Sequence, residues 1–214
     1  MTGPPARRFG SSTAATAEHP MPRRRATSYD SKLVHIRDTA AALFARDGFS
    51  RTSMAELANA CGVSKALLYH YFDSKEAMLF DILRAYLDNL ESVVSIEPAA
   101  SAARRDHLRA LIGALLGQYR QASNTHKLLT FDLPVLPPSQ QDTLRQTERR
   151  IMARFEAALA DAAAEAGRSQ TIDGPRTMML FGTLNWTYTW FREDGPMMLD
   201  AYCDLVTDST IRSL

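Results

Sequence analysis

Residues 52–75, TSMAELANACGVSKALLYHYFDSK, predict two short helices joined by a tight turn. Ser53 stands three residues before Glu56, which is the spacing of a capping box at a helix start. Gly62 follows the apolar positions of the first helix, where helices commonly close with a left-handed residue. Ser64 is suited to cap the second helix through its hydroxyl. The stretch therefore predicts a helix–turn–helix.

The second helix of the pair is expected to have two faces. Val63, Leu67 and Tyr71 are spaced by four residues, so they are predicted to pack inward. The outward face is then expected to carry Lys65, Ala66, Leu68 and Tyr69. In a helix–turn–helix this outer face enters a DNA major groove. Periodicity alone leaves a second interpretation open, a helical hairpin inside an ordinary α-domain with the aromatic side chains as core.

The residue types of this stretch suit a double-stranded DNA partner. Lysine supplies positive charge for phosphates, and the free N–H groups of helix N-termini also suit phosphate oxygens. Hydroxyl and imidazole groups can hydrogen-bond phosphates or base edges. We expect Lys65, Ala66 and Tyr69 to face bases and the nearby backbone. The predicted phosphate contacts are Thr52, Ser53, Ser64, His70, Tyr71 and Lys75.

The motif resembles the DNA-binding signature of the TetR/AcrR family of tetracycline-repressor-like transcriptional regulators. The resemblance is carried by Thr52-Ser53, Leu57-Ala58, Cys61-Gly62-Val63-Ser64, Leu68-Tyr69-His70-Tyr71-Phe72 and Lys75-Glu76. The family pattern has Thr, Ile and Ala where this sequence has Ser53, Leu57 and Cys61, and each exchange keeps the cap or core role. The resemblance implies a regulator that binds a palindromic operator as a dimer, most often a repressor released by a small molecule. It leaves an activator open.

Composition and charge add weaker constraints. The net charge of the 214-residue chain is only +1, but residues 1–80 carry 11 Lys/Arg against 7 Asp/Glu, and residues 81–214 carry 14 against 17. A basic front and a mildly acidic rear fit a DNA-binding end and a second domain. Cys61 and Cys203 do not suggest a disulfide framework. No apolar run or signal-peptide core is present, which predicts a soluble, cytoplasmic protein without membrane contact.

The sequence gives no sign of catalysis. It contains no nucleophile elbow, Walker loop, dinucleotide fingerprint or zinc-ligand spacing. Its five histidines are scattered, with no pair at helical spacing. We therefore predict no catalytic residues, no metal site and no cofactor. His126 and Asp132 could be polar groups in a pocket, but a satisfied structural role is the simpler interpretation.

The expected fold is all-α with about nine helices. Residues 1–29 are predicted to form a disordered basic tail, in which Arg23 to Arg25 either remain solvated or reach DNA as an arm. Residues 30–90 should form a three-helix DNA-binding bundle, with the motif at 53–72. Residues 91–214 should form a helical ligand-binding and dimerisation domain. The expected helices are 31–47, the pair in 53–72, 74–97, a helix around 108–119, 126–133, 139–166, 175–191 and a last helix ending at 214.

The last two helices are predicted to form the homodimer interface, within residues 175–214. The helix over 175–191 is apolar nearly all round, so we expect it to be buried on more than one side. An alternative function follows from the same helices: an architectural or partner-dependent DNA-binding protein whose rear domain only dimerises. A cavity between helices would favour the ligand-responsive regulator, because a pure dimerisation domain packs solid.

The segment from Leu184 to Gly195 is similar to a TetR subgroup that responds to acyl-coenzyme A thioesters. This resemblance implies an apolar channel, with cations at its mouth for the coenzyme A phosphates. The simpler alternative places the aromatic residues of this segment in the dimer core. The cations proposed for the mouth are Arg120, Arg149, Arg192 and the pair Arg104-Arg105. The predicted ligand-binding residues are Leu90, Val94, Leu115, Tyr119, Phe131, Met152, Phe155, Trp186 and Arg192.

Overall fold

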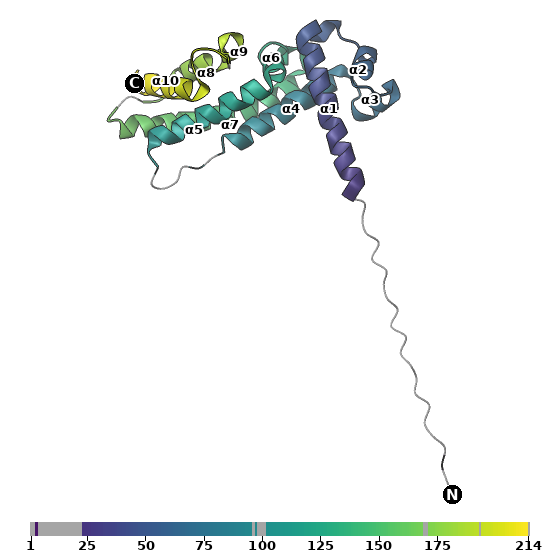
Figure 1. Cartoon of the computed structure of the whole chain (residues 1–214), viewed down its shortest axis with the longest axis horizontal. Helices are drawn as coiled ribbons and strands as arrows, with labels where there is room; N and C mark the ends of the chain where they lie inside the picture. The colour runs from purple at the N-terminus through teal and green to yellow at the C-terminus, as the bar shows by residue number, and fades with distance from the viewer. Residues whose placement is uncertain are drawn as a thin grey trace. The chain divides into compact units, whose positions relative to one another are not determined.

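The computed structural model describes residue 3 and residues 23–95, 97, 102–168, 171–192 and 194–213. Within these residues all regular structure is helical, which confirms the predicted fold class (Figure 1). Ten α-helices and two 3₁₀ turns fall in this part of the chain. They are α1 (Arg23–Asp47), η1 (Phe49–Arg51), α2 (Met54–Ala60), α3 (Lys65–Tyr71), α4 (Lys75–Val93), α5 (Arg104–Gln121), α6 (Ser123–Phe131), η2 (Leu133–Val135), α7 (Pro138–Glu165), α8 (Gly174–Asn185), α9 (Thr187–Trp190) and α10 (Leu199–Arg212).

The chain divides into two units, residues 1–34 and 35–214, and α1 continues through the division. In the first unit α1 begins at Arg23, so the predicted start at Ser31 is wrong. Arg and Ala are strong helix formers, whereas the preceding Pro22 is tolerated only in a first turn. Residues 23–29, predicted as tail, are therefore helical. The rest of the predicted disordered tail lies, apart from residue 3, outside the described residues.

The second unit begins with the small bundle that carries the helix–turn–helix. Ile36, Ala40 and Phe44 recur every four residues along α1 and are at most 1% exposed. The Phe44 ring packs on the Phe49 ring with centroids 5.1 Å apart. The Cys61 thiol lies against the carbonyl of Ile36 at 3.9 Å, and burial raises the pKa of this thiol. Cys61 is therefore a small packing residue, as the sequence predicted.

Three long helices, α4, α5 and α7, pack against one another in the remainder of the second unit (Figure 1). The start of α4 follows the helix–turn–helix, and its later turns bond to α5, α6 and α7 through Asn89, Tyr86 and Glu91. At about 1.5 Å per residue its 19 residues span about 28 Å. Helix α10 lies on α5, where Arg105 and Arg109 donate to the Asp204 carboxylate at 2.9 and 2.8 Å.

The predicted helix over 175–191 is broken in two. Helix α8 ends at Asn185, and α9 is a single turn. The Thr187 hydroxyl donates to the carbonyl of Leu184 at 2.7 Å, and the Thr189 hydroxyl donates to the carbonyl of Trp186 at 2.7 Å. Such side-chain bonds compete with the helical hydrogen-bond ladder, and hydrophobic periodicity does not reveal them. Among the described residues no helix combines the length and apolar character needed to cross a bilayer.

Candidate DNA interface and effector cavity

Both helices of the motif begin with the predicted caps. The Glu56 N–H donates to the Ser53 hydroxyl at 3.2 Å, and the Ser53 N–H donates to the Glu56 carboxylate at 2.8 Å. This reciprocal pair is the capping box expected from the sequence. The Leu67 N–H donates to the Ser64 hydroxyl at 3.1 Å, which caps α3. An N-cap of this kind contributes about 1 kcal/mol, so each helix start is fixed by its own sequence.

The turn between α2 and α3 closes around Gly62. This residue has φ of 66°, a left-handed conformation that glycine adopts without steric cost. The Gly62 N–H donates to the carbonyl of Asn59 at 3.1 Å, and the Val63 N–H donates to that of Ala58 at 3.0 Å. Together these bonds form a Schellman motif, which satisfies the last carbonyls of α2. The turn therefore sets the angle at which α3 leaves α2.

The outer face of α3 exposes Lys65, Ala66 and Tyr69, as predicted, and it also exposes His70. The Lys65 ammonium lies 5.8 Å from the centroid of the Tyr69 ring, within the range of a cation–π contact. The predicted outward orientation of Leu68 is wrong, because this side chain is fully buried whereas Leu67 and Tyr71 are half-buried. The rotation of so short a helix is set by the preceding turn, and seven residues carry too little periodicity to reveal it.

Two predicted phosphate contacts are engaged within the protein. The Lys75 ammonium donates to the carbonyls of Phe49, Ser50 and Thr52 at 3.0, 3.3 and 3.3 Å, and it lies 4.6 Å from the centroid of the Phe49 ring. Thr52 is buried, and its hydroxyl donates to the carbonyl of Gly48 at 3.0 Å. Both residues hold the η1 turn in place. Their proposed contact with phosphate stays a prediction, and this geometry favours a positioning role.

A surface hollow of about 540 Å³ lies between the starts of α2 and α4 and the outer face of α3. Five predicted DNA-contact residues line it, and four do not: Ser64, Ala66, His70 and Tyr71. Arg51 was not predicted, although it is an exposed cation on the same lining, and its guanidinium donates to the carbonyl of Asp47. Its position directly before the Thr-Ser pair was the available signal. The predicted residues in the hollow are Thr52, Ser53, Lys65, Tyr69 and Lys75.

The rear part of the second unit contains a cavity of about 300 Å³, which we call the main cavity. Helices α4 to α8 all contribute to it, and most of its lining is apolar. Such a concave, largely apolar site with a few polar groups is typical of small-molecule pockets. The lining residues are Leu87, Leu90, Leu115, Tyr119, His126, Leu129, Thr130, Glu148, Ile151, Met152, Met178, Phe181 and Asn185.

His126 organises the polar side of the main cavity. Its ring stacks on that of Tyr119 with centroids 3.9 Å apart, and its Nδ1 lies 3.3 Å from the Tyr86 hydroxyl. Its Nε2 lies 3.4 Å from the carbonyl of Asn185, and the Tyr119 hydroxyl donates to the Asn185 side-chain oxygen at 2.8 Å. Burial lowers the pKa of His126 to about 4 and raises the pKa of both tyrosines. The network is therefore neutral at pH 7.

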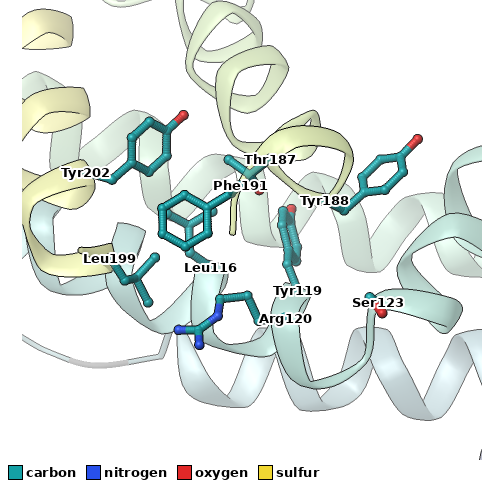
Figure 2. Close-up of a pocket in the computed structure, with 9 residues that line it drawn as sticks. All are labelled: Leu116, Tyr119, Arg120, Ser123, Thr187, Tyr188, Phe191, Leu199 and Tyr202. Carbon is teal, nitrogen blue, oxygen red and sulfur yellow. The ribbon is translucent and has the colours of Figure 1, made fainter. Parts of the chain in front are cut away.

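A second cavity of about 180 Å³ shares Tyr119 with the main cavity and lies between α5 and the α9–α10 segment (Figure 2). Arg120 is on its lining, together with the rings of Phe191 and Tyr202, whose centroids are 5.8 Å apart. Figure 2 shows the rings of Phe191 and Tyr202 with Arg120 among the residues that line this cavity. This smaller cavity combines aromatic surface with a cation.

Four of the nine predicted ligand-binding residues line the main cavity: Leu90, Leu115, Tyr119 and Met152. Val94 and Phe155 are buried but lie outside the lining, with Phe155 packed behind Phe181 at 5.1 Å between ring centroids. Phe131 and Trp186 are more than half exposed. They follow the lining residues Thr130 and Asn185, and successive helical residues point about 100° apart. The structure also places Arg192 outside both linings, exposed and paired with Asp194 at 3.2 Å.

His126 was a predicted candidate for a polar pocket residue, whereas Glu148 and Asn185 were not predicted. Glu148 belongs to a helix rich in arginine and glutamate, whose charged residues a periodic pattern assigns to solvent. Asp132, the other candidate, lies off the lining, and burial raises the pKa of its carboxyl. Within the described part of the chain no cluster of three or more His, Cys, Asp or Glu is arranged to hold a metal ion.

Helices α8 and α10 present apolar side chains at the surface. Met178, Met179 and Leu205 are 52%, 69% and 47% exposed. A groove of about 680 Å³ runs between the two helices, lined by Met179, Leu180, Leu205 and Val206 among others. Helix α8 buries its opposite face, so it has one covered and one open apolar face within a single chain. Large exposed apolar patches mark interaction surfaces.

Comparison with known proteins places this architecture in a family. Residues 36–82 match bacterial regulatory proteins of the tetR family, and residues 101–214 match the tetracyclin repressor-like C-terminal domain. The second match alone covers more than half of the chain. The chain belongs to the TetR family of bacterial regulatory proteins. Because the matched groups consist of regulators, the TetR assignment agrees with the prediction that the protein is not an enzyme.

Individual TetR relatives are similar to parts or most of the chain. The repressor KstR2 of Rhodococcus jostii is 41% identical over 75 residues, which is 35% of this chain and 37% of that protein. The activator FasR of Mycolicibacterium smegmatis is 29% identical over 163 residues, which is 76% of this chain and 73% of that protein. A TetR-family regulator from Bordetella parapertussis has 33% identity and a TM-score of 0.73, covering 85% and 95% of the two chains. The chain thus spans well under half of the first curated relative.

Proposed function

We propose that the protein is a transcriptional regulator that binds a palindromic operator as a dimer and responds to a small molecule in the main cavity. The observation that carries this proposal is the exposed face of α3, held by two capped helix starts and a glycine-closed turn. A recognition helix needs such a fixed and accessible face. We assign base and nearby backbone contacts to Lys65, Ala66 and Tyr69. The phosphate contacts proposed are Ser53, Ser64, His70, Tyr71 and the additional Arg51.

The open faces of α8 and α10 support a dimer. Pairing these faces with those of a second chain would form a four-helix bundle and cover the groove between them. The two recognition helices would then enter successive major grooves about 34 Å apart. We therefore keep the proposed interface within residues 175–214.

Helix α4 gives the proposed regulation a physical route. Leu87 and Leu90 on its later turns line the main cavity, while Lys75 at its start bonds the carbonyls of the η1 turn. A ligand that displaces the later turns would move this start and hence the position of α2 and α3. Its effect on DNA affinity equals its differential affinity for the DNA-bound and released conformations. The cavity favours this regulator over an architectural protein that only dimerises.

The direction of control and the effector are the finer parts of the proposal. We propose a repressor, as KstR2 is, although the relative FasR is an activator. The apolar lining of the main cavity would suit the acyl chain of an acyl-coenzyme A effector. Two of the cations suggested for its phosphates are already engaged: Arg105 with three aspartates and Arg192 with Asp194. We therefore propose, as the main reading, an effector that needs no phosphate site.

The test is operator binding by variants of the α3 outer face. An operator would first be selected from random duplexes with the wild-type protein, and fluorescence anisotropy would give its affinity. We expect Lys65→Ala and Tyr69→Ala to weaken binding about 10-fold or more, since contacts to base edges are worth about 1–3 kcal/mol each. Lys127→Ala, which changes an exposed lysine on α6, is the matched control. Wild-type affinity of both α3 variants would refute the assigned face.

A further inference from the structure

We propose that the main cavity binds an apolar organic cation, whose ammonium group pairs with the carboxylate of Glu148. This inference rests on the proposed function, because it names the effector class for the cavity of the regulator. It differs from the acyl-thioester hypothesis in the charge of the ligand group that enters the main cavity.

The polar groups around the main cavity differ in what they have left to bind. The Tyr119 hydroxyl donates to Asn185, and both ring nitrogens of His126 have partners within 3.4 Å. The Thr130 hydroxyl donates to the carbonyl of His126 at 2.9 Å. The Glu148 carboxylate lines the same cavity, yet among the described residues no hydrogen bond or ion pair within 4 Å engages it. Its acceptor capacity is therefore available to a ligand.

The charge around Glu148 favours a cationic ligand. None of the described residues that line the main cavity is a lysine or an arginine, so Glu148 is the one charged side chain among them. Arg145 and Arg149 attract the carboxylate from the same helix without forming an ion pair with it. Burial has the larger effect and raises the pKa of this carboxyl. A half-buried carboxylate without an ion pair is unfavourable, and a bound ammonium group would compensate it.

The remaining lining suits the apolar body of such a ligand. Leu87, Leu90, Leu115, Ile151 and Met152 provide aliphatic surface from three helices. The Phe181 ring adds an aromatic surface, which also attracts cations. An organic anion would instead bring its charge into an apolar chamber that already holds a carboxylate and no cation. The lining thus discriminates by charge as well as by size.

The experiment compares three probes that share one apolar body. 4-Phenylbutylamine, 4-phenylbutanol and 4-phenylbutyrate would be titrated into the full-length protein by isothermal calorimetry at pH 7. We expect the amine to bind most tightly, the alcohol about 10-fold or more weakly, and the acid not measurably. Butyryl-coenzyme A is a fourth probe for the thioester hypothesis. Tighter binding of the acid or of the thioester than of the amine would overturn the proposal.

Two variants locate the ammonium group. Glu148→Gln keeps the shape of the side chain and removes its charge, so we expect it to weaken amine binding about 10- to 100-fold. Binding of the alcohol should change less than about 3-fold, which shows that the cavity is intact. Asp142→Asn, an exposed acid on the same helix, is the control and should leave both affinities unchanged. Wild-type amine affinity in Glu148→Gln would contradict the proposed pair.

The proposed regulator function and the proposed cation site can be refuted independently of each other. Calorimetry uses the protein alone, whereas operator binding is measured without any probe. A protein that binds its operator but not the amine would overturn the cation inference and leave the regulator intact. A protein that binds the amine but selects no DNA sequence would overturn the proposed function instead. Release of the operator by the amine, lost in Glu148→Gln, would connect the two.

Discussion

At the scale of single residues, His126 makes folding sensitive to acid. Its pKa in the folded protein is about 4 because burial disfavours the imidazolium, whereas an unfolded histidine has a pKa near 6.5. The unfolded chain therefore binds more protons between these values. The stabilising contribution is complete above pH 6.5 and is lost as pH falls toward 4. We expect this residue to account for a decrease of up to about 3 kcal/mol in the free energy of unfolding.

The measurement is urea unfolding between pH 7 and 4, compared for wild type and His126→Phe. The substitution keeps a ring beside Tyr119 but removes the titration, so the stability of the wild type relative to the variant should fall by up to about 3 kcal/mol as the pH falls from 6.5 toward 4. The variant profile must be subtracted from the wild-type profile, because other groups also titrate in this range. Burial raises the pKa of the Glu148 and Asp132 carboxyls, so these two groups add stability as the pH falls. Parallel profiles for wild type and His126→Phe would contradict the assignment.

Residues of the two sites were predictable from sequence to different degrees. Lys65 and Tyr69 were found because a short motif fixes their spacing from the capped helix starts. Leu90, Leu115, Tyr119 and Met152 were found because they lie on the apolar stripes of their helices. Glu148 was missed, since its helix alternates acids and arginines that a periodic pattern assigns to solvent. Which polar residue faces a void depends on packing between helices, and no local pattern contains that information.

At the scale of helices, Lys75 connects α4 to the helix–turn–helix. Replacing it by Met keeps much of the side chain but removes three hydrogen bonds to backbone carbonyls. Hydrogen bonds to charged groups contribute about 1.5–3 kcal/mol each, so we expect Lys75→Met to lower the free energy of unfolding by about that amount or more. Lys65→Met, on the exposed face of α3, should change stability by less than about 0.5 kcal/mol.

DNA binding distinguishes this positioning role from a phosphate contact. If Lys75 only holds the η1 turn, Lys75→Met should weaken operator binding by displacing that turn. The salt dependence of operator binding should then remain unchanged. A lysine that neutralises a phosphate would reduce the slope of log affinity against log salt by about 1. Anisotropy titrations at several salt concentrations measure this slope. A reduced slope with unchanged stability would restore the phosphate contact predicted from sequence.

The helices themselves were predictable wherever local chemistry defines their ends. The starts at Ser53, Ser64 and Ser74 follow from hydroxyl caps that are present in the structure. The break after Asn185 was missed because it depends on the hydrogen bond from the Thr187 hydroxyl to the carbonyl of Leu184, which the sequence pattern does not reveal. An unbroken apolar pattern continues across that point, so periodicity alone extended the helix to residue 191.

At the scale of the whole molecule, assembly decides whether two recognition helices can act together. Within one chain, α8 and α10 leave apolar side chains open on both sides of a groove of about 680 Å³. Apolar side chains exposed in this way would favour aggregation of an isolated chain, and a second copy of the chain that covers them would remove that exposure. Placing a charge in the centre of such an interface is costly, because the charge loses water without gaining a partner.

Leu205→Glu places that charge on the exposed face of α10, beside the groove. We expect the wild-type protein to sediment as a dimer at micromolar concentration and the variant to sediment as a folded monomer. Operator affinity should fall much more than affinity for a single half-site, since one chain can fill only one half of the palindrome. Val135→Glu, at an equally exposed apolar position in η2, is the control and should remain dimeric. A wild-type monomer, or a Leu205→Glu variant with unchanged dimer affinity, would place the interface elsewhere.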